Sequence, residues 1–446
     1  MGLRSHRIDC IRALAPVFAS MLICAGSLQA YSHMDDYVTE GEEQSVTLRS
    51  TDSDEAVKAR VYQHFSKEVV DRGKEYRNTK YVMFFMRIGI SIVFLSIIVW
   101  IRGARWIGYL SDSPSSDKSW LIAGIVAAIL TVAISAVTLP VNIYSGYIHE
   151  HAFGLSTRDL SGWLFDLGKY VTIQVVLAFI IFAGLYRIMA AFPSAWWIVS
   201  AAVFSLFTVA MTALSPLIID PLFNKFTPLE DEDLKKDVIE LAKDAGIEVD
   251  KVYKMNASLR TRKLNAYFTG LGKTKRVILY DTLLSKSSPS EVKMVLAHEI
   301  GHWKRNHLWK GLLLASSGTF IVVFIISRVL ASPFALNRGI ASFDDPAGVP
   351  LIMLIVLLLG FLSMPIQNAI SRHFENQADM DSLILTEDPD TFIRVEEKMG
   401  RTNLNDVDPN PLIKWLLFTH PSTMERILVA EKFKRQRPFE NAEERI

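Results

Sequence analysis

The chain has 446 residues, of which 50% are hydrophobic and 21% charged, and its formal net charge is +1. A balance this close to neutral gives no case for binding nucleic acid. The two cysteines, Cys10 and Cys24, lie at the extreme N-terminus, which excludes a disulfide framework and a cysteine-based metal site. Mean hydropathy is +0.23, and the charges gather between long apolar runs. This distribution predicts a membrane protein with soluble parts.

Apolar segments set the expected architecture. Six of seven are long enough to cross about 30 Å of hydrocarbon as helices. The first segment is ambiguous, because Arg4, Arg7 and Arg12 precede an apolar stretch that ends near Ala30. It is either a secretory signal peptide or a retained transmembrane helix. The segments are residues 13–31, 81–101, 119–140, 170–191, 195–216, 311–331 and 349–370.

Two polar stretches separate the early apolar segments. Residues 32–79 are polar and rather acidic, and their second half favours a helix over 54–78. The link 141–169 is expected to be structured at the membrane surface. Its two histidines, His149 and His151, are two residues apart and do not share a helical face, which argues against a metal site there.

An α+β block is predicted after the fifth apolar segment, over residues 217–310. Ser288 has the chemistry of a helix N-cap, and Glu291 completes a capping box, so a helix is expected to begin there. The other expected elements are an amphipathic helix over 230–245, a strand over 252–255, and a hairpin formed by strands over 264–269 and 276–279.

The motif His298-Glu299-Ile300-Gly301-His302 lies two turns into that helix. The two imidazoles are four residues apart, so they point from one helical face and can hold one Zn²⁺. Glu299 between them can take a proton from a metal-activated water. For these five residues alone, the alternative interpretation is a helix with two ordinary packed or solvated histidines.

A hydrolytic zinc site needs a third protein ligand. Residues 371–379 emerge directly from the last apolar segment and are expected to be helical, with Glu375 and Asp379 on one side. One carboxylate can bind the metal while the other holds a motif histidine by its free ring N–H. Glu375 is the predicted ligand, and His373 is its rival. Two membrane crossings separate this run from the zinc helix, so both helices end on the same membrane face.

These motifs resemble one known family. Residues 295–304 (VLAHEIGHWK) are similar to the zinc helix of the type I CAAX prenyl proteases, which are integral-membrane zinc metalloendopeptidases. The likeness covers most of residues 60–430. It includes residues 264–268 (LNAYF), 275–283 (KRVILYDTL), 218–229 (IIDPLFNKFTPL), Leu139-Pro140, Tyr144-Ser145, the third-ligand helix 371–379, and 419–422 (THPS) with Glu425 and Arg426.

The resemblance implies the catalytic centre and the fold. His298, His302 and Glu375 would bind one zinc ion per chain, and Glu299 would act as general base and acid. The fold would be mainly α and multi-pass, with seven transmembrane helices that enclose a water-filled chamber. A zincin-like α+β catalytic part would carry the short β-hairpin. This likeness favours keeping the first segment as a helix.

The resemblance also implies supporting roles. Asp379 would hold the metal ligands in place, and Arg426 would support the site. Asn265 and Ala266 would lie on an edge strand that pairs with the substrate backbone. His420 would approach the scissile carbonyl and stabilise the oxyanion that develops there.

The sequence therefore predicts a membrane-embedded zinc metalloendopeptidase, acting as a monomer on peptide or protein substrates. The substrate is either a prenylated protein that loses its C-terminal tripeptide or a membrane protein in quality control. The signal-like N-terminus and the acidic stretch after it indicate a bacterial member, for which the inner membrane is the expected location. The charges do not decide which membrane face carries the zinc.

Two alternatives fit parts of the sequence. A site-2-type intramembrane protease carries its motif inside an apolar helix, whereas Glu291 and Lys304 make this helix polar at both ends. A transporter or scaffold would give the site no catalytic use. A transporter should have helices broken near mid-membrane, whereas Pro216, Pro350 and Pro365 lie near segment ends. The predicted division is 1–31, 32–79, 80–216, 217–310, 311–370 and a C-terminal helical domain over 371–446.

Overall fold

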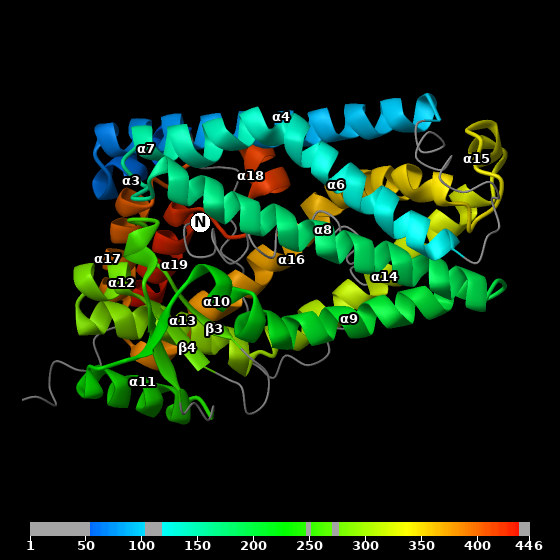
Figure 1. Ribbon diagram of the computed structural model, residues 1–446. Helices are drawn as coiled ribbons and strands as arrows, with labels where there is room; N and C mark the ends of the chain where they lie inside the picture. The colour runs from blue at the N-terminus through cyan, green and yellow to red at the C-terminus, as the bar shows by residue number, and fades with distance from the viewer. Residues whose placement is uncertain (1–53, 103–117, 247–250, 270–275, 437–446) are drawn as a thin grey trace, which may run out of the picture.

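The computed structural model of the chain describes residues 54–102, 118–246, 251–269 and 276–436 (Figure 1). Within these residues, six helices are long and apolar enough to cross a membrane. Each matches one predicted apolar segment to within one residue at the segment ends or contains it, and the seventh segment, 13–31, lies outside the described residues. The six are α4 (Lys67–Trp100), α6 (Ser119–Ile143), α8 (Leu160–Ala191), α9 (Trp196–Ile218), α14 (His307–Leu330) and α16 (Val349–Thr386).

These six helices pack in a closed ring. α4 contacts α6, which contacts α8; α8 contacts α9, which contacts α14; α14 contacts α16, which returns to α4. Figure 1 shows α4 and α9 on opposite sides of the molecule, with α16 between them. Apolar side chains such as Phe182, Val322 and Ile352 are buried between neighbours. The predicted mainly α, multi-pass fold is confirmed, while the enclosed chamber stays a prediction.

Two of the six helices continue well beyond their apolar segments. α4 begins at Lys67, where Ser66 caps it by accepting from the Val69 N–H at 3.4 Å. α16 continues to Thr386 and so carries the whole run 371–379 as helix. At 1.5 Å per residue, Glu375 lies about 8 Å along the axis from residue 370, the last of the apolar segment. One continuous helix thus carries the predicted third ligand beyond the end of the apolar segment.

A small sheet lies against the motif helix. Its strand order is β1-β2-β4-β3, with β2 and β4 parallel and the other pairs antiparallel. The predicted hairpin is confirmed as β3 and β4, with Ala266 opposite Leu279. β3 is therefore an edge strand. The strands are β1 (Phe226–Pro228), β2 (Val252–Met255), β3 (Ala266–Thr269) and β4 (Arg276–Tyr280).

The motif helix α13 begins where its sequence predicts. Ser288 accepts from the Glu291 N–H at 3.3 Å, and the Glu291 carboxylate accepts from the Ser288 N–H at 2.8 Å, which confirms the capping box. α13 packs against α16, α17, α11 and β3. The remaining elements are α3 (Asp54–His64), η2 (Tyr144–Ile148), α7 (His149–Ala152), α10 (Asp220–Phe223), α11 (Glu232–Asp244), η3 (Ala257–Leu259), α12 (Asp281–Lys286), α13 (Pro289–Lys304), α15 (Pro333–Asn337), η5 (Pro346–Gly348), α17 (Pro389–Thr402), α18 (Pro411–Leu417) and α19 (Thr423–Gln436).

Candidate metal centre

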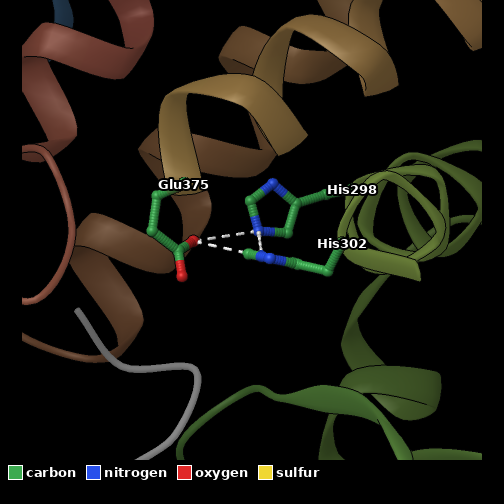
Figure 2. Close-up of side chains that lie close together, drawn as sticks. All are labelled: His298, His302 and Glu375. Atoms are coloured by element: carbon green, nitrogen blue, oxygen red, sulfur yellow. Dashed lines mark hydrogen bonds and ion pairs between the residues drawn. The ribbon is translucent and has the colours of Figure 1, made fainter. Parts of the chain in front are cut away.

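Three predicted ligands meet between α13 and α16 (Figure 2). Nε2 of His298 lies 3.2 Å from Nε2 of His302. Oε2 of Glu375 lies 3.1 Å from His298 Nε2 and 3.5 Å from His302 Nε2. All three side chains are largely enclosed, and that of Glu375 is 1% exposed. Two nitrogens and one carboxylate oxygen that face one another in this way could hold a metal ion.

A close approach of the two helices makes this meeting possible. A Cβ added to Gly301 would lie 2.9 Å from the Cα of Ala378 and 3.1 Å from its carbonyl oxygen. Gly301 is the residue before His302, and Ala378 comes three residues after Glu375. The glycine inside the motif therefore lets α13 lie directly on the backbone of α16, which brings ligands from two distant parts of the chain together.

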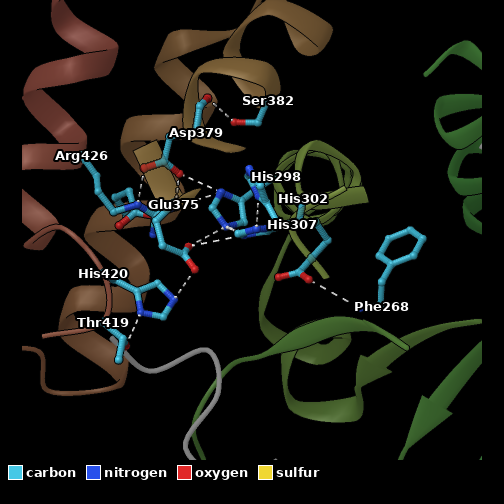
Figure 3. Close-up of polar contacts among 12 residues, drawn as sticks. Phe268, His298, His302, His307, Glu375, Asp379, Ser382, Thr419, His420 and Arg426 are labelled. Carbon is cyan, nitrogen blue, oxygen red and sulfur yellow. Dashed lines mark hydrogen bonds and ion pairs between the residues drawn. The ribbon is translucent and has the colours of Figure 1, made fainter. Parts of the chain in front are cut away.

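A buried ion network orients the first histidine (Figure 3). Nδ1 of His298 lies 2.7 Å from Oδ1 of Asp379. Arg426 donates to both oxygens of Asp379, at 2.8 and 2.5 Å, and it pairs with Glu396 at 2.5 Å. Asp379 therefore fixes the ring that faces Glu375, as a carboxylate behind a metal-binding histidine does. Below, the metal cluster means His298, His302, Glu375, Asp379 and Arg426.

The network also sets protonation. Burial acts to lower the pKa of His298, but the hydrogen bond and charge of Asp379 outweigh it and raise that pKa to about 10. A metal ion has to displace this proton, because only the neutral imidazole binds metal. Burial opposes the charge of Arg426 as well, yet Asp379 and Glu396 raise its pKa, so the guanidinium stays charged.

Glu299 leaves α13 toward the edge strand. The Phe268 N–H points at Oε2 of Glu299, 3.5 Å away. The Tyr280 N–H donates to the Asn265 carbonyl at 3.1 Å, so this carbonyl faces β4. The backbone of the next residue, Ala266, then faces the open edge. Oδ1 of Asn265 is buried and has no hydrogen-bond partner in the part of the chain that the structure describes.

His420 reaches the metal cluster from the C-terminal part of the chain. Its Nε2 lies 3.2 Å from Oε1 of Glu375, the oxygen turned away from the two imidazoles. Oγ1 of Thr419 lies 2.8 Å from its Nδ1 and restrains the ring. His420 is buried, so its ring nitrogen faces the site rather than bulk water.

The sequence did not indicate His307, which also belongs to this site. Nδ1 of His307 lies 2.9 Å from Nδ1 of His302, and its other nitrogen lies 2.9 Å from Oε1 of Gln377. The spacing of five carries no helical signal, because Asn306 has a φ of 56° and separates α13 from α14. The rival ligand His373 does not lie in this group: its ring contacts Gln377 at 3.1 Å, whereas Glu375 faces the two imidazoles.

Comparisons with known proteins cover both halves of the molecule. The sequence matches the family described as peptidase family M48 over residues 228–434, and the one described as CAAX prenyl protease N-terminal, five membrane helices, over residues 48–225. It is 31% identical over 377 residues to an uncharacterized metalloprotease, YhfN, of Bacillus subtilis, spanning 80% of this chain and 84% of that protein. It is 32% identical over 339 residues to CAAX prenyl protease 1 of Saccharomyces cerevisiae, spanning 71% and 74%. The fold is similar to the crystal structure of S. mikatae Ste24p, with a TM-score of 0.74 and 23% identity over 95% of this chain and 98% of that one.

Proposed function

This chain belongs to peptidase family M48 and is an integral-membrane metallopeptidase, and we propose that His298, His302 and Glu375 hold one catalytic zinc ion. The observation that carries the proposal is the meeting of three donor atoms from α13 and α16 beside Glu299. Two imidazoles and one carboxylate suit a borderline-soft divalent ion. The family relation and the geometry support the same reaction, which is hydrolysis of a peptide bond.

The spacing of the donor atoms supports zinc in particular. Ligand atoms about 2.1 Å from a tetrahedral zinc ion lie about 3.4 Å from one another. The three separations among His298, His302 and Glu375 are 3.1, 3.2 and 3.5 Å. A larger ion such as Ca²⁺ takes six to eight oxygen ligands, which this site does not offer.

Glu299 moves the proton in the proposed reaction. The chemistry that zinc supplies when bound is Lewis acidity, which polarises a peptide carbonyl and acidifies a water molecule. Glu299 accepts a proton as the water oxygen forms its bond to the carbonyl carbon, and delivers it to the nitrogen as the C–N bond breaks. The contact between Glu299 and the Phe268 N–H places this carboxylate between the ligands and the edge strand.

Other residues position the substrate and stabilise charge. Asn265 directly precedes the edge strand and Ala266 begins it, and the open backbone of this strand pairs with an extended peptide. His420 donates to the oxyanion that develops on the scissile carbonyl. Asp379 and Arg426 hold His298 in place rather than touch the substrate.

The proposed substrate is a prenylated protein whose C-terminal tripeptide is removed. The name of the Saccharomyces relative, CAAX prenyl protease 1, supports this substrate class, and so does α16, which carries Glu375 directly from a candidate membrane span. A role in membrane protein quality control is the second candidate, because relation to the Bacillus metalloprotease is compatible with either substrate. In both cases the bond cleaved is a peptide bond.

One experiment tests the reaction and the substrate together. Wild-type protein and Glu299→Gln, purified in detergent, are given a farnesylated C-terminal peptide and the same peptide without the lipid. Glu299→Gln should lower kcat/KM by roughly 10²- to 10⁴-fold and keep its zinc, measured by elemental analysis. Unchanged cleavage by Glu299→Gln would refute the catalytic role. Equal cleavage of both peptides would favour the quality-control substrate.

A further inference from the structure

A second buried charged group lies outside the metal centre, and we call it the strand cluster: Tyr76, Arg77, Lys80, Glu150 and Lys263. The Glu150 carboxylate pairs with Lys80 Nζ at 2.6 Å and with Lys263 Nζ at 3.0 Å. It also accepts from the Tyr76 hydroxyl at 2.7 Å, and Lys263 donates to that hydroxyl at 3.0 Å. Helix α4, helix α7 and the segment that enters β3 therefore meet at one carboxylate.

Cations outnumber carboxylates in the strand cluster. Arg77, Lys80 and Lys263 place their charges 5.3, 5.8 and 5.4 Å from the centre of the Tyr76 ring. Among the described residues, Glu150 is the only acid that forms an ion pair with any of the three. The Lys263 side chain is 8% exposed and that of Lys80 is 28% exposed. Uncompensated charge at such depth costs free energy unless an anion shares the site.

Neighbouring groups do not balance the excess. Arg77 donates to the carbonyl oxygens of Leu404 and Asn403, at 3.0 and 3.4 Å, rather than to an acid. Asp406 lies on the same side and accepts from the Tyr81 hydroxyl at 3.3 Å. Burial raises the pKa of the Asp406 carboxyl, although the nearby charges of Lys74 and Arg77 act to lower it.

The strand cluster is attached to the edge strand. Lys263 comes three residues before Ala266, where β3 begins, which is about 10 Å of extended chain. Leu264 lies between Lys263 and the start of β3, and the Asn403 side chain holds its backbone with two hydrogen bonds. Asn403 accepts from the Leu264 N–H at 3.0 Å and donates to the Leu264 carbonyl at 3.3 Å. Thr282 donates to the Lys263 carbonyl at 2.7 Å. The cations and the substrate-pairing edge are thus held in a fixed relation.

We propose that the strand cluster binds the free C-terminal carboxylate of the substrate, and that Lys80 contacts it. The inference rests on the proposed function, in which the cleaved bond lies three residues from that carboxylate. Three extended residues span about 10 Å, which matches the separation of Ala266 from Lys263 along the chain. The substrate then runs antiparallel to β3, with its C-terminus toward residue 263.

Lys80 is the contact residue because it has a free donor on the more exposed of the two lysine side chains. Its ammonium group pairs with Glu150 and donates to the Ser145 carbonyl at 2.7 Å, which leaves a third N–H. Lys263 also uses two of its three donors, on Glu150 and Tyr76, but its side chain is only 8% exposed, against 28% for Lys80. Lys80 therefore selects the substrate, and Lys263 holds Glu150 and the strand in register.

A cation also lies at the other end of β3, and it defines the competing orientation. Arg276 is opposite Thr269 in the hairpin. Its guanidinium donates to the Pro216 carbonyl and lies 5.7 Å from the centre of the Phe226 ring. Among the described residues at this end, Arg276 already has a carbonyl and an aromatic ring as partners, whereas three cations share one carboxylate at the Lys263 end. Charge therefore favours the antiparallel orientation.

The test compares two forms of one peptide substrate, with a free C-terminal carboxylate and with a C-terminal amide. A charge-assisted hydrogen bond to the carboxylate should give the wild type about a ten- to hundredfold higher kcat/KM for the free acid. Lys80→Met should bring this ratio close to one. Lys74→Met, on the same helix but paired with Asp408 at 3.9 Å, should keep the wild-type ratio. Because each ratio is internal to one variant, partial loss of folded protein does not affect it.

The outcomes separate the inference from the function on which it rests. If the wild type cleaves neither peptide, the proposed function fails. If it cleaves both equally well, or if Lys80→Met keeps the preference, the function stands and the carboxylate site is refuted. If Arg276→Leu removes the preference while Lys80→Met does not, the substrate runs in the opposite direction and the inference is overturned.

Discussion

The metal cluster and the strand cluster are both largely buried, and both lie near the edge strand β3. The balance of positive and negative side chains in them is opposite in sign. Around His298, the carboxylates of Glu375, Asp379 and Glu396 face one guanidinium, Arg426. Around Tyr76, three cations face one carboxylate, Glu150. An excess of anions suits a divalent cation, and an excess of cations suits a carboxylate.

The two clusters also differ in the parts of the fold that build them. The metal cluster joins α13, α16 and α19, which are packed directly on one another. The strand cluster joins α4 and α7 to the irregular segment before β3. The first arrangement keeps ligands rigid, as catalysis requires. The second arrangement connects the ring of six apolar helices to the strand along which we propose that the substrate lies. It is therefore positioned to bind the substrate rather than to react with it.

Removing the cation of the metal cluster should have the largest effect on stability. Arg426→Met leaves Asp379 and Glu396 buried without their partner, and breaking a buried pair in this way costs about 3–5 kcal/mol. The measurement is the free energy of unfolding in detergent, from chemical denaturation of the zinc-free protein. The double variant with Glu396→Gln should recover part of the loss. A loss of less than about 1 kcal/mol in the free energy of unfolding would mean that the network contributes little to stability.

A smaller change to the same cluster should act on the metal. Asp379→Asn keeps the shape of the side chain but removes the charge that holds His298, and losing such a partner lowers metal affinity by about 10- to 100-fold. Competition with a chromophoric chelator measures this directly. The matched control is Glu150→Gln in the strand cluster, which should leave zinc affinity as in the wild type. Equal losses in both variants would show that the clusters are not separate.

The helix contact that builds the metal cluster can be tested at one glycine. Gly301→Ala puts a Cβ 2.9 Å from the Cα of Ala378, so α13 and α16 must move apart. Overpacking of this kind costs about 1–3 kcal/mol. Zinc affinity should fall with stability, because His302 and Glu375 separate. Gly311→Ala, on α14 with open space around it, is the control and should keep zinc affinity without any loss of stability.

Sequence patterns predicted the metal cluster better than the strand cluster, for a physical reason. His298 and His302 are one helical turn apart, and Glu375 and Asp379 repeat that spacing on the helix that leaves the membrane, so local periodicity brings each pair to one face. Lys263 and Tyr76 are 187 residues apart, and no local pattern signals their contact. His307 was missed because a left-handed residue separates it from the helix of His302.

The difference between local signals and long-range contacts also explains which parts of the fold the sequence predicted. Six apolar segments and the β-hairpin have strong local signals, and the structure contains them all. β1 has only three residues, one of which is Pro228, so neither alternation nor composition marks it as a strand. Its pairing with β2 is set by tertiary contact, through the register of Thr227 with Lys254.

The smallest expected effect is a change in the preference for a substrate with a free C-terminal carboxylate. It tests the difference between the two clusters most sharply, because the variant should raise this preference rather than lower it. Glu150→Gln removes the one carboxylate of the strand cluster, so Lys80 loses its competing anion. The Lys80 side chain is 28% exposed, so the gain should be that of a partly screened charge pair, about 0.2–1 kcal/mol or roughly a 1.4- to fivefold higher ratio of free-acid to amide cleavage. Stability should fall at the same time, since Lys80 and Lys263 then repel each other without a partner between them. The peptide pair measures the ratio, and thermal unfolding measures the stability. A lower ratio would mean that Glu150 holds Lys80 in place for the substrate, and that geometry rather than excess charge makes the site.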